Sequence, residues 1–170
     1  IGRKIAFSLK QRIIEGKLRL NLVAGTKEGV NDYFNEVKNE INSENINVIY
    51  SSDLYEYFSE FNKILTTTDI LWTKPSELSF YSALGIPIIM APAIGSQEKF
   101  NSKWLLEIHA GIKQENPDFA HQWLFDYLNK GMLAEAAWSG FLKARKLGTY
   151  KILEVLRHGR MNIPNDPVLR

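Results

Sequence analysis

Residues 69–101 read DILWTKPSELSFYSALGIPIIMAPAIGSQEKFN, and this stretch predicts the fold of the chain. Residues 70–72 and 86–90 are short apolar runs without polar alternation. Such runs are typical of strands that are buried on both faces of a parallel sheet. The two loops that follow these strands then lie at the same edge of the sheet, where open α/β sheets bind their ligands.

The segment between these two strands suits a helix of a few turns. Ser76 or Thr73 can serve as its N-cap, and Gly85 can stop it. The N-terminus of such a helix presents backbone N–H groups and the positive end of a dipole, which suit a phosphate group.

Outside this stretch, strands continue to alternate with helices along the chain. The further predicted strands are Leu18–Ala24, Asn47–Tyr50 and a short edge strand, Ile112–Gln114. Asp53 and Asn116 are placed to cap two of the helices, and Pro117 occupies a first turn. The alternation predicts an α/β fold with a Rossmann-like parallel sheet and helices on both faces. We expect one domain over residues 1–158 and a C-terminal tail over residues 159–170.

One predicted helix carries an aromatic stripe at helical spacing. Its members are Leu54, Tyr57, Phe58, Phe61 and Leu65. A stripe of this kind belongs to the core far more often than to a ligand site, so we expect it to be buried.

Composition excludes several classes of protein. The chain has 170 residues, of which 45% are hydrophobic and 24% charged, as in ordinary soluble domains. Its net charge is +2 with the basic residues scattered, so nucleic-acid binding has little support. The absence of cysteine removes disulfides, thiolate metal sites and cysteine nucleophiles, and it fits a cytosolic protein. The longest apolar stretch is too short to span a bilayer, so we expect no transmembrane segment.

The usual catalytic signatures are missing. The sequence has no glycine-rich dinucleotide fingerprint, no P-loop and no nucleophile elbow. The three histidines, His109, His121 and His158, lie far apart and lack the spacing of metal ligands. We expect no metal site and no resident cofactor, and we assign no histidine a catalytic role.

The 69–101 stretch resembles the donor half of the GT-B glycosyltransferases. The resemblance lies in the strand DILW, the helix end ALGIP, the strand that ends at Pro92, and QEKFN before LLEIHAG. It is closest to the peptidoglycan N-acetylglucosaminyltransferases that use UDP-N-acetylglucosamine, and it extends in order over most of the chain. It implies a Rossmann-like domain, the C-terminal half of a GT-B fold, that binds a nucleotide-activated sugar without a metal.

The resemblance also implies the site residues. The turn made by Lys74, Pro75, Ser76 and Glu77 would face the diphosphate and the sugar, chiefly through backbone N–H groups. Gln97 and Glu98 would bind the sugar hydroxyls. Tyr50, Ser51 and Leu54 would border the nucleobase.

Two departures from the family pattern bear on donor binding. The family places a glutamate, which binds the ribose hydroxyls, five residues before the glycine of G-x-P, and here that residue is Phe80. The turn holds Lys74-Pro75 where the family often has glycine. Glu77 and Lys74 could rebuild the ribose and phosphate contacts, or donor binding could be altered or lost.

The leading hypothesis is therefore transfer of a sugar from a nucleotide donor, with a UDP-sugar favoured and the acceptor unknown. The acceptor site and the catalytic base would lie in an absent N-terminal domain, so this chain alone would be inactive. Two alternatives stay open: a non-catalytic GT-B-like interaction module that has lost the donor site, and a GT-B-fold nucleotide-sugar epimerase. The expected location is the cytoplasm, with peripheral attachment to the membrane left open.

A last expectation concerns the first residues. In the family order a central strand precedes the first helix and lies between the strands that match Leu18–Ala24 and Ile70–Trp72. The helix begins almost at Ile1, so these residues leave no chain for that strand. Three outcomes are open: the two flanking strands pair directly, another segment or chain lies between them, or the molecule has residues that this sequence omits. We favour the last two, in which the flanking strands do not hydrogen-bond to each other directly.

Overall fold

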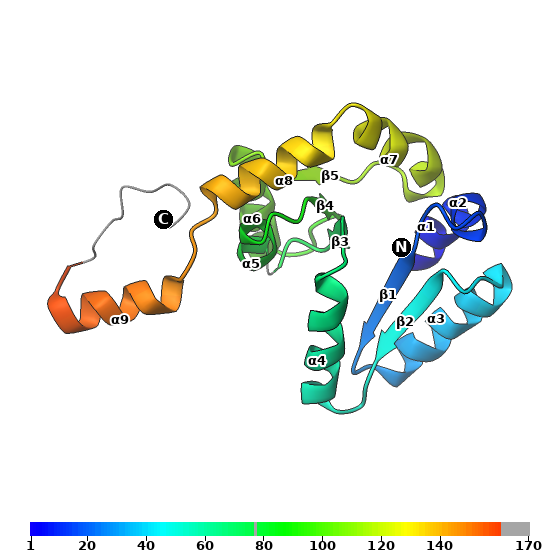
Figure 1. The fold of residues 1–170 in the computed structure, drawn as a ribbon, viewed down its shortest axis with the longest axis horizontal. Coiled ribbons are helices and arrows are strands. Elements are labelled where there is room, and N and C mark those ends of the chain that lie inside the picture. The colour runs from blue at the N-terminus through cyan, green and yellow to red at the C-terminus, as the bar shows by residue number, and fades with distance from the viewer. Residues whose placement is uncertain (77, 161–170) are drawn as a thin grey trace. The chain divides into compact units, whose positions relative to one another are not determined.

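The computed structural model describes residues 1–76 and 78–160. The chain divides into two compact units, which are drawn in Figure 1. The first comprises residues 1–68 and 115–126, and the second comprises residues 69–114 and the chain from residue 127 onward. The expectation of a single domain over residues 1–158 stays a prediction. Glu77 and residues 161–170, most of the predicted tail, lie outside the described residues.

The first unit is built on a two-stranded parallel sheet. Its strands are β1 (Leu20–Gly25) and β2 (Ile46–Tyr50), in a register that places Leu22 beside Val48. Its helices are α1 (Gly2–Ser8), α2 (Lys10–Ile14), α3 (Glu28–Ile41), α4 (Leu54–Leu65), the 3₁₀-helix η1 (Pro117–Phe119) and the start of α7 (Ala120–Asn129). Helix α3 connects the strands and contacts both, so its apolar face and the sheet bury each other.

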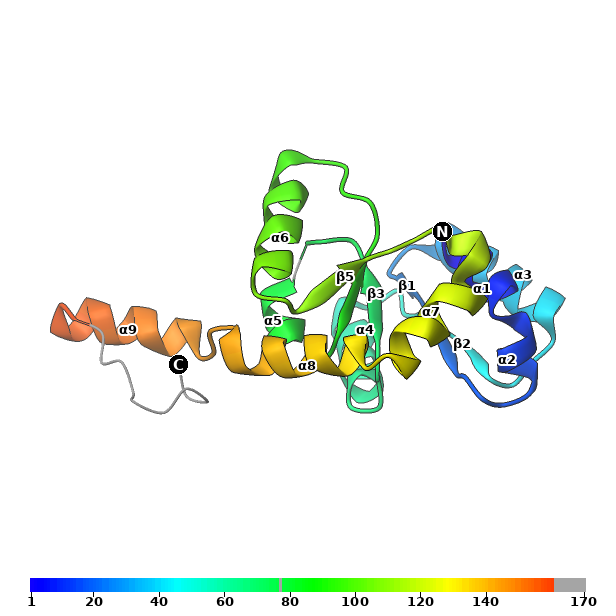
Figure 2. The ribbon, with the colours of Figure 1, turned by 90° about the horizontal axis from the view of Figure 1, so that it is seen from above.

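The second unit is built on a three-stranded parallel sheet with β4 in the centre. Its strands are β3 (Leu71–Thr73), β4 (Ile88–Met90) and β5 (Gly111–Lys113). Its helices are α5 (Leu78–Ala83), α6 (Ser96–Glu107), α8 (Met132–Lys143) and α9 (Gly148–His158), shown from above in Figure 2. Successive residues of a strand point to opposite faces of its sheet. Since Ile88, Ile89 and Met90 are all at most 2% exposed, both faces of β4 are covered.

These elements confirm the predicted fold class, a Rossmann-like α/β fold with parallel strands flanked by helices. All five predicted strands form, each within two residues of its expected bounds, and β5 is an edge strand as expected. The strands form two separate sheets, one in each unit. In the described residues β1 pairs with β2 and β3 pairs with β4, with no pairing between β1 and β3. The division falls where the resemblance leaves room for a further strand.

The predicted helix ends are mostly confirmed. Asp53 accepts hydrogen bonds from the backbone N–H groups of Tyr55 and Glu56, both at 2.9 Å. The turn at Gly85 adopts φ +79°, which favours glycine, and its N–H donates to Ser82 O. The N-cap of α5 stays a prediction for Ser76 and Thr73, because Glu77, the residue before Leu78, lies outside the described residues.

The aromatic stripe on α4 is not buried, and this expectation is wrong. None of the residues of α4, all of which the structure describes, is buried, and Leu54 and Phe58 are about half exposed. In its own unit α4 contacts β2 of a sheet that has only two strands. So small a sheet offers too little surface to cover the whole stripe.

Helix α8 packs closely against α5. A Cβ atom at Gly140 would lie 2.8 Å from the backbone oxygen of Ser82 and 3.2 Å from Cβ of Ala110. The contact therefore requires a residue without a side chain in the middle of α8. This close contact fixes α8 against α5, the helix that follows β3.

Candidate functional site

One side chain joins the loop after β3 to the middle of α6. The amide nitrogen of Asn101, on α6, donates to the backbone oxygen of Pro75 at 3.0 Å and to that of Ser76 at 2.9 Å. A side-chain amide has two N–H groups, so both are used. The two segments that follow β3 and β4 are thus held next to each other within the second unit.

The three described residues of the loop after β3 have different environments. Lys74 and Ser76 are exposed, whereas the ring of Pro75 is buried. The N–H of Ser76 donates to the backbone oxygen of Lys74 at 2.8 Å, and proline has no N–H. Of the backbone N–H donors that the resemblance implied, the one at Ser76 is therefore already hydrogen-bonded, and Pro75 has none. Among the described residues of this loop, the exposed side chain of Lys74 is the group that remains to contact a diphosphate. Glu77 lies outside the described residues.

Gln97 and Glu98 lie in the first turn of α6 and differ in their contacts. Glu98 accepts a hydrogen bond from the backbone N–H of Ile94 at 2.7 Å, so its carboxylate holds the loop that leads into the helix. Gln97 is exposed and lies one turn before Asn101, hence on the same face of α6. Since Asn101 contacts the loop after β3, Gln97 is better placed than Glu98 to hydrogen-bond to a ligand beside Lys74.

The remaining predicted residues lie at the end of β2 and directly after it, in the first unit. Ser51 Oγ accepts from the N–H of Asp53 at 3.1 Å and donates to a carboxylate oxygen of Glu56 at 3.0 Å, which uses its hydroxyl within the cap of α4. Tyr50 is half-buried and Leu54 is 51% exposed. These residues belong to one unit and the loops after β3 and β4 to the other. That all of them border a single ligand stays a prediction.

Phe80 occupies the position at which the related family has a ribose-binding glutamate. It lies on α5 and is 57% exposed, with its ring edge-to-face against Tyr81 at a centroid distance of 5.4 Å. A residue with this exposure is not needed for the core. Another side chain can therefore be placed there without creating a cavity.

Sequence reasoning did not assign a role to Asn101, although it quoted the QEKFN segment in which the residue stands. The four-residue spacing from Gln97 to Asn101 was the available signal, because it places both amides on one face of a helix. Its partners are 25 and 26 residues away in the sequence, which no local pattern reveals.

A hollow that sequence reasoning did not foresee lies in the first unit. It is open to solvent, has a volume of about 610 Å³, and is lined by Arg3, Lys4, Phe7, Ser8, Asp118 and His121. Ser8 Oγ accepts from the backbone N–H of His121 at 3.1 Å and lies 3.0 Å from its Nδ1. These contacts fasten the end of α1 to the start of α7.

The charges around this hollow are paired. Arg3 makes a bidentate pair with Glu40, with both N–O distances 2.7 Å, and the hydrogen bond lowers the pKa of the Glu40 carboxyl below its ordinary value. Lys4 Nζ lies 2.8 Å from a carboxylate oxygen of Asp118. With each cation matched by a carboxylate, the hollow has no excess charge to attract an ion.

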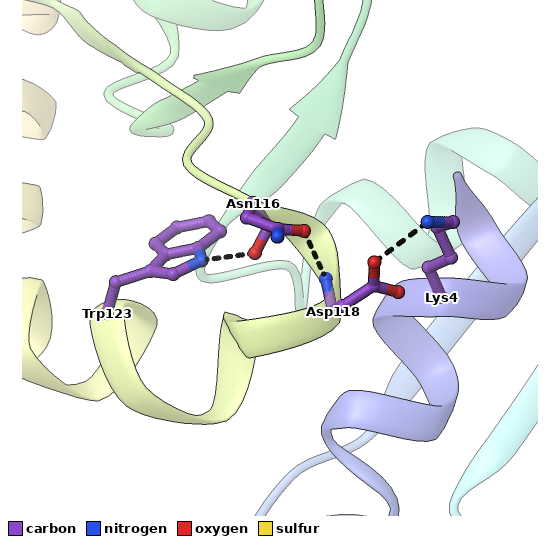
Figure 3. A network of polar contacts seen from close by, with 4 residues as sticks. All are labelled: Lys4, Asn116, Asp118 and Trp123. Carbon is purple, nitrogen blue, oxygen red and sulfur yellow. Dashed lines mark hydrogen bonds and ion pairs between the residues drawn. The ribbon is translucent and has the colours of Figure 1, made fainter.

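Figure 3 shows how Asp118 is held in place. The side chain of Asn116 accepts from the N–H of Asp118 at 3.0 Å, which confirms the predicted cap. The indole N–H of Trp123 donates to the backbone oxygen of Asn116 at 2.9 Å. The network fixes the turn before α7, and with it the contact to Lys4. Its role is therefore structural.

Two properties of the described residues bear on cofactors and membranes. In residues 1–76 and 78–160 no three histidine, aspartate or glutamate side chains gather as they would around a metal ion. None of the helices in these ranges is long and apolar enough to cross a membrane.

Comparison with curated proteins and with solved structures gave no match. One family model, described as Domain of unknown function (DUF6938), matches residues 3–152. The match covers the strands of both units, the loop and helix joined by Asn101, and all of α8. The chain therefore belongs to the DUF6938 family.

Proposed function

We propose that this chain is the donor-binding half of a metal-independent GT-B glycosyltransferase, with a UDP-sugar as the favoured donor. The observation that carries the proposal is the pair of hydrogen bonds from Asn101 to the loop after β3. They hold the loop after β3 against α6, the helix that follows β4, at the carboxyl edge of the sheet, which is where parallel α/β sheets bind ligands.

The roles follow from the side chains that these loops leave exposed. The ammonium group of Lys74 would offset the charge that develops on the leaving diphosphate, as a basic side chain does in place of a metal. Gln97 would hydrogen-bond sugar hydroxyls from the same face of α6 as Asn101. The acceptor site and the catalytic base would belong to a different domain, so sugar transfer is not expected of these residues alone.

The location that fits this function is the cytoplasm, because a chain without cysteine suits a reducing compartment. The partners in this proposal are the nucleotide-sugar donor and an acceptor-binding domain. Neither a nucleic acid nor a resident cofactor enters it.

A second candidate is a GT-B-like module that has lost the donor site and acts by protein interaction. The exposed ring of Phe80 favours it, because an apolar side chain replaces the acid that would bind ribose. Three other exposed apolar residues lie just after α5, in the loop before α6 and on α6: Leu84, Ile94 and Phe100.

Calorimetric titration of the full-length protein with UDP, GDP and TDP sugars separates the two candidates. The donor site predicts saturable binding of at least one of them, which Lys74→Ala weakens. Phe80→Glu supplies the missing acid at an exposed position and should strengthen binding of the nucleotide part, by about one hydrogen bond to a charged group, about 2 kcal/mol. An absence of binding in both the wild-type protein and Phe80→Glu would exclude the donor site and leave the interaction module.

A further inference from the structure

Helix α9 exposes a continuous apolar stripe. None of its residues, all of which the structure describes, is buried. Four aliphatic side chains are exposed: Ile152 at 63%, Leu153 at 42%, Val155 at 42% and Leu156 at 77%. In both views α9 stands clear of the strands and other helices of its unit (Figures 1 and 2). Nothing in the second unit covers this surface in the described residues.

The stripe occupies one side of the helix. With 100° between successive residues, the four aliphatic side chains fall within about half of the helix surface. The charged residues Lys151, Glu154 and Arg157 fall on the other half, together with His158. Lys151 and Glu154 also form an ion pair at 3.6 Å, as side chains three residues apart on one face do. The helix is therefore amphipathic, with its apolar side facing solvent.

Positive charge is concentrated around this helix. Residues 143–160 contain six lysines and arginines and one acid, a net charge of +5. The other residues of the chain contain 15 basic and 18 acidic side chains, a net charge of −3. Arg145, Arg157 and Arg160 are exposed, so basic groups stand both before and after the apolar stripe.

We propose that residues 143–160 are a binding site for anionic lipid membranes. Helix α9 lies in the plane of the bilayer surface, with Ile152, Val155 and Leu156 among the acyl chains. The arginines before and after the stripe contact the phosphate groups of the lipids. The helix presents an apolar stripe between basic residues, and the rest of the chain is net negative. This combination matches the surface of an anionic lipid bilayer better than it matches a second copy of the chain.

This proposal is independent of the donor site. A nucleotide-sugar titration is done without lipid, and a lipid-binding measurement is done without nucleotide sugar. If one test fails, for the donor site or for lipid binding, the result therefore does not count against the other proposal.

Sedimentation of the full chain with lipid vesicles tests it. We expect binding to vesicles of phosphatidylcholine with about 30% phosphatidylglycerol to be at least about tenfold stronger than binding to phosphatidylcholine alone. On binding, backbone amides of Gly148–His158 should gain protection from hydrogen exchange, which localises the contact to α9. High salt should weaken the binding, because part of the attraction is electrostatic.

Two variants separate the apolar and the charged contributions. Ile152→Ser with Leu156→Ser, and separately Arg157→Gln with Arg160→Gln, should each reduce binding to the anionic vesicles by about tenfold or more. The matched controls are Ile94→Ser, an aliphatic side chain with 75% exposure, and Lys99→Gln with Lys103→Gln on α6. Both controls should bind as the wild type does. Since the α9 residues are exposed, the variants should keep the thermal unfolding midpoint of the wild type.

Three results would overturn the proposal. The wild type could fail to bind anionic vesicles, or the α9 variants could bind them as strongly as the controls do. In the third case light scattering would show a wild-type dimer that Ile152→Ser with Leu156→Ser converts to a monomer, without lipid binding. That result would assign the stripe to a second copy of the chain.

Discussion

The side-chain amide of Asn101 donates a hydrogen bond to the backbone oxygen of Ser76 at 2.9 Å. The same nitrogen reaches the oxygen of Pro75, so one residue of α6 fixes two successive peptide groups of the loop after β3. The loop makes few other polar contacts among its described residues, apart from the N–H of Ser76 bonded to the oxygen of Lys74. Asn101 thus helps to hold the loop beside α6, together with the buried ring of Pro75.

Replacing Asn101 with alanine removes both hydrogen bonds. We expect the free energy of unfolding to fall by about 1–3 kcal/mol in urea denaturation, since each bond contributes about 1 kcal/mol. Asn39→Ala, at an exposed position on α3, is the control and should change stability by less than about 0.5 kcal/mol. Equal losses in the two variants would show that the bonds from Asn101 do not support the loop.

The proposed role of Gln97 predicts a selective loss of sugar binding. Gln97→Ala in the full-length protein should weaken binding of the nucleotide sugar by about 1 kcal/mol, the usual contribution of one hydrogen bond. Binding of the nucleotide alone should stay nearly unchanged in calorimetry, as should both affinities in the control Gln122→Ala. If Gln97→Ala weakened both ligands equally, Gln97 would not contact the sugar.

The contact between α8 and α5 predicts that glycine-to-alanine substitution lowers stability at Gly140 but not at Gly29, which lies in an open position on α3. Gly140→Ala places a methyl group against the backbone oxygen of Ser82 and should destabilise the protein by about 1–3 kcal/mol. Gly29→Ala, in the first turn of α3, meets no atom within 4 Å and should be neutral or stabilising by up to about 1 kcal/mol. Thermal unfolding of the two variants measures the difference. A stabilising effect of Gly140→Ala would mean that the two helices separate without cost.

The pair between Arg3 and Glu40 predicts a dependence on pH. The hydrogen bond from Arg3 lowers the pKa of Glu40, so the stabilisation is fully present above the ordinary carboxyl pKa of 4.5. It is lost as the pH falls through the lowered pKa of the folded state. In Arg3→Ala, NMR titration of the Glu40 carboxyl should show its pKa raised back toward the ordinary value. An unchanged titration midpoint would exclude the guanidinium as the cause.

The sequence predicted much of the secondary structure because the deciding signals are local. The strands are short apolar runs between glycine, proline and polar residues, and each was placed to within two residues. The caps at Asp53 and Asn116 and the turn at Gly85 follow from the chemistry of single side chains and of one φ angle.

What the sequence did not predict depends on tertiary neighbours. The stripe on α4 has the spacing of a buried face, but its burial depends on how much sheet lies beneath it. The ring of Pro75 is buried and the N–H of Ser76 is bonded within its own loop, and neither fact follows from a loop sequence. The division of the sheet between β1 and β3 was expected from the resemblance to a family, not from periodicity.

The division of the sheet also has a consequence for handling the protein. In the described residues β1 has a hydrogen-bonded neighbour on one side only, and its sequence, Leu-Asn-Leu-Val-Ala-Gly, contains neither a charge nor a proline. Natural proteins use such residues to keep open strand edges from pairing between molecules. Where no other segment pairs with this edge, concentrated samples are expected to self-associate along β1. Val23, which is 40% exposed, is the position at which a lysine would oppose this with little loss of packing.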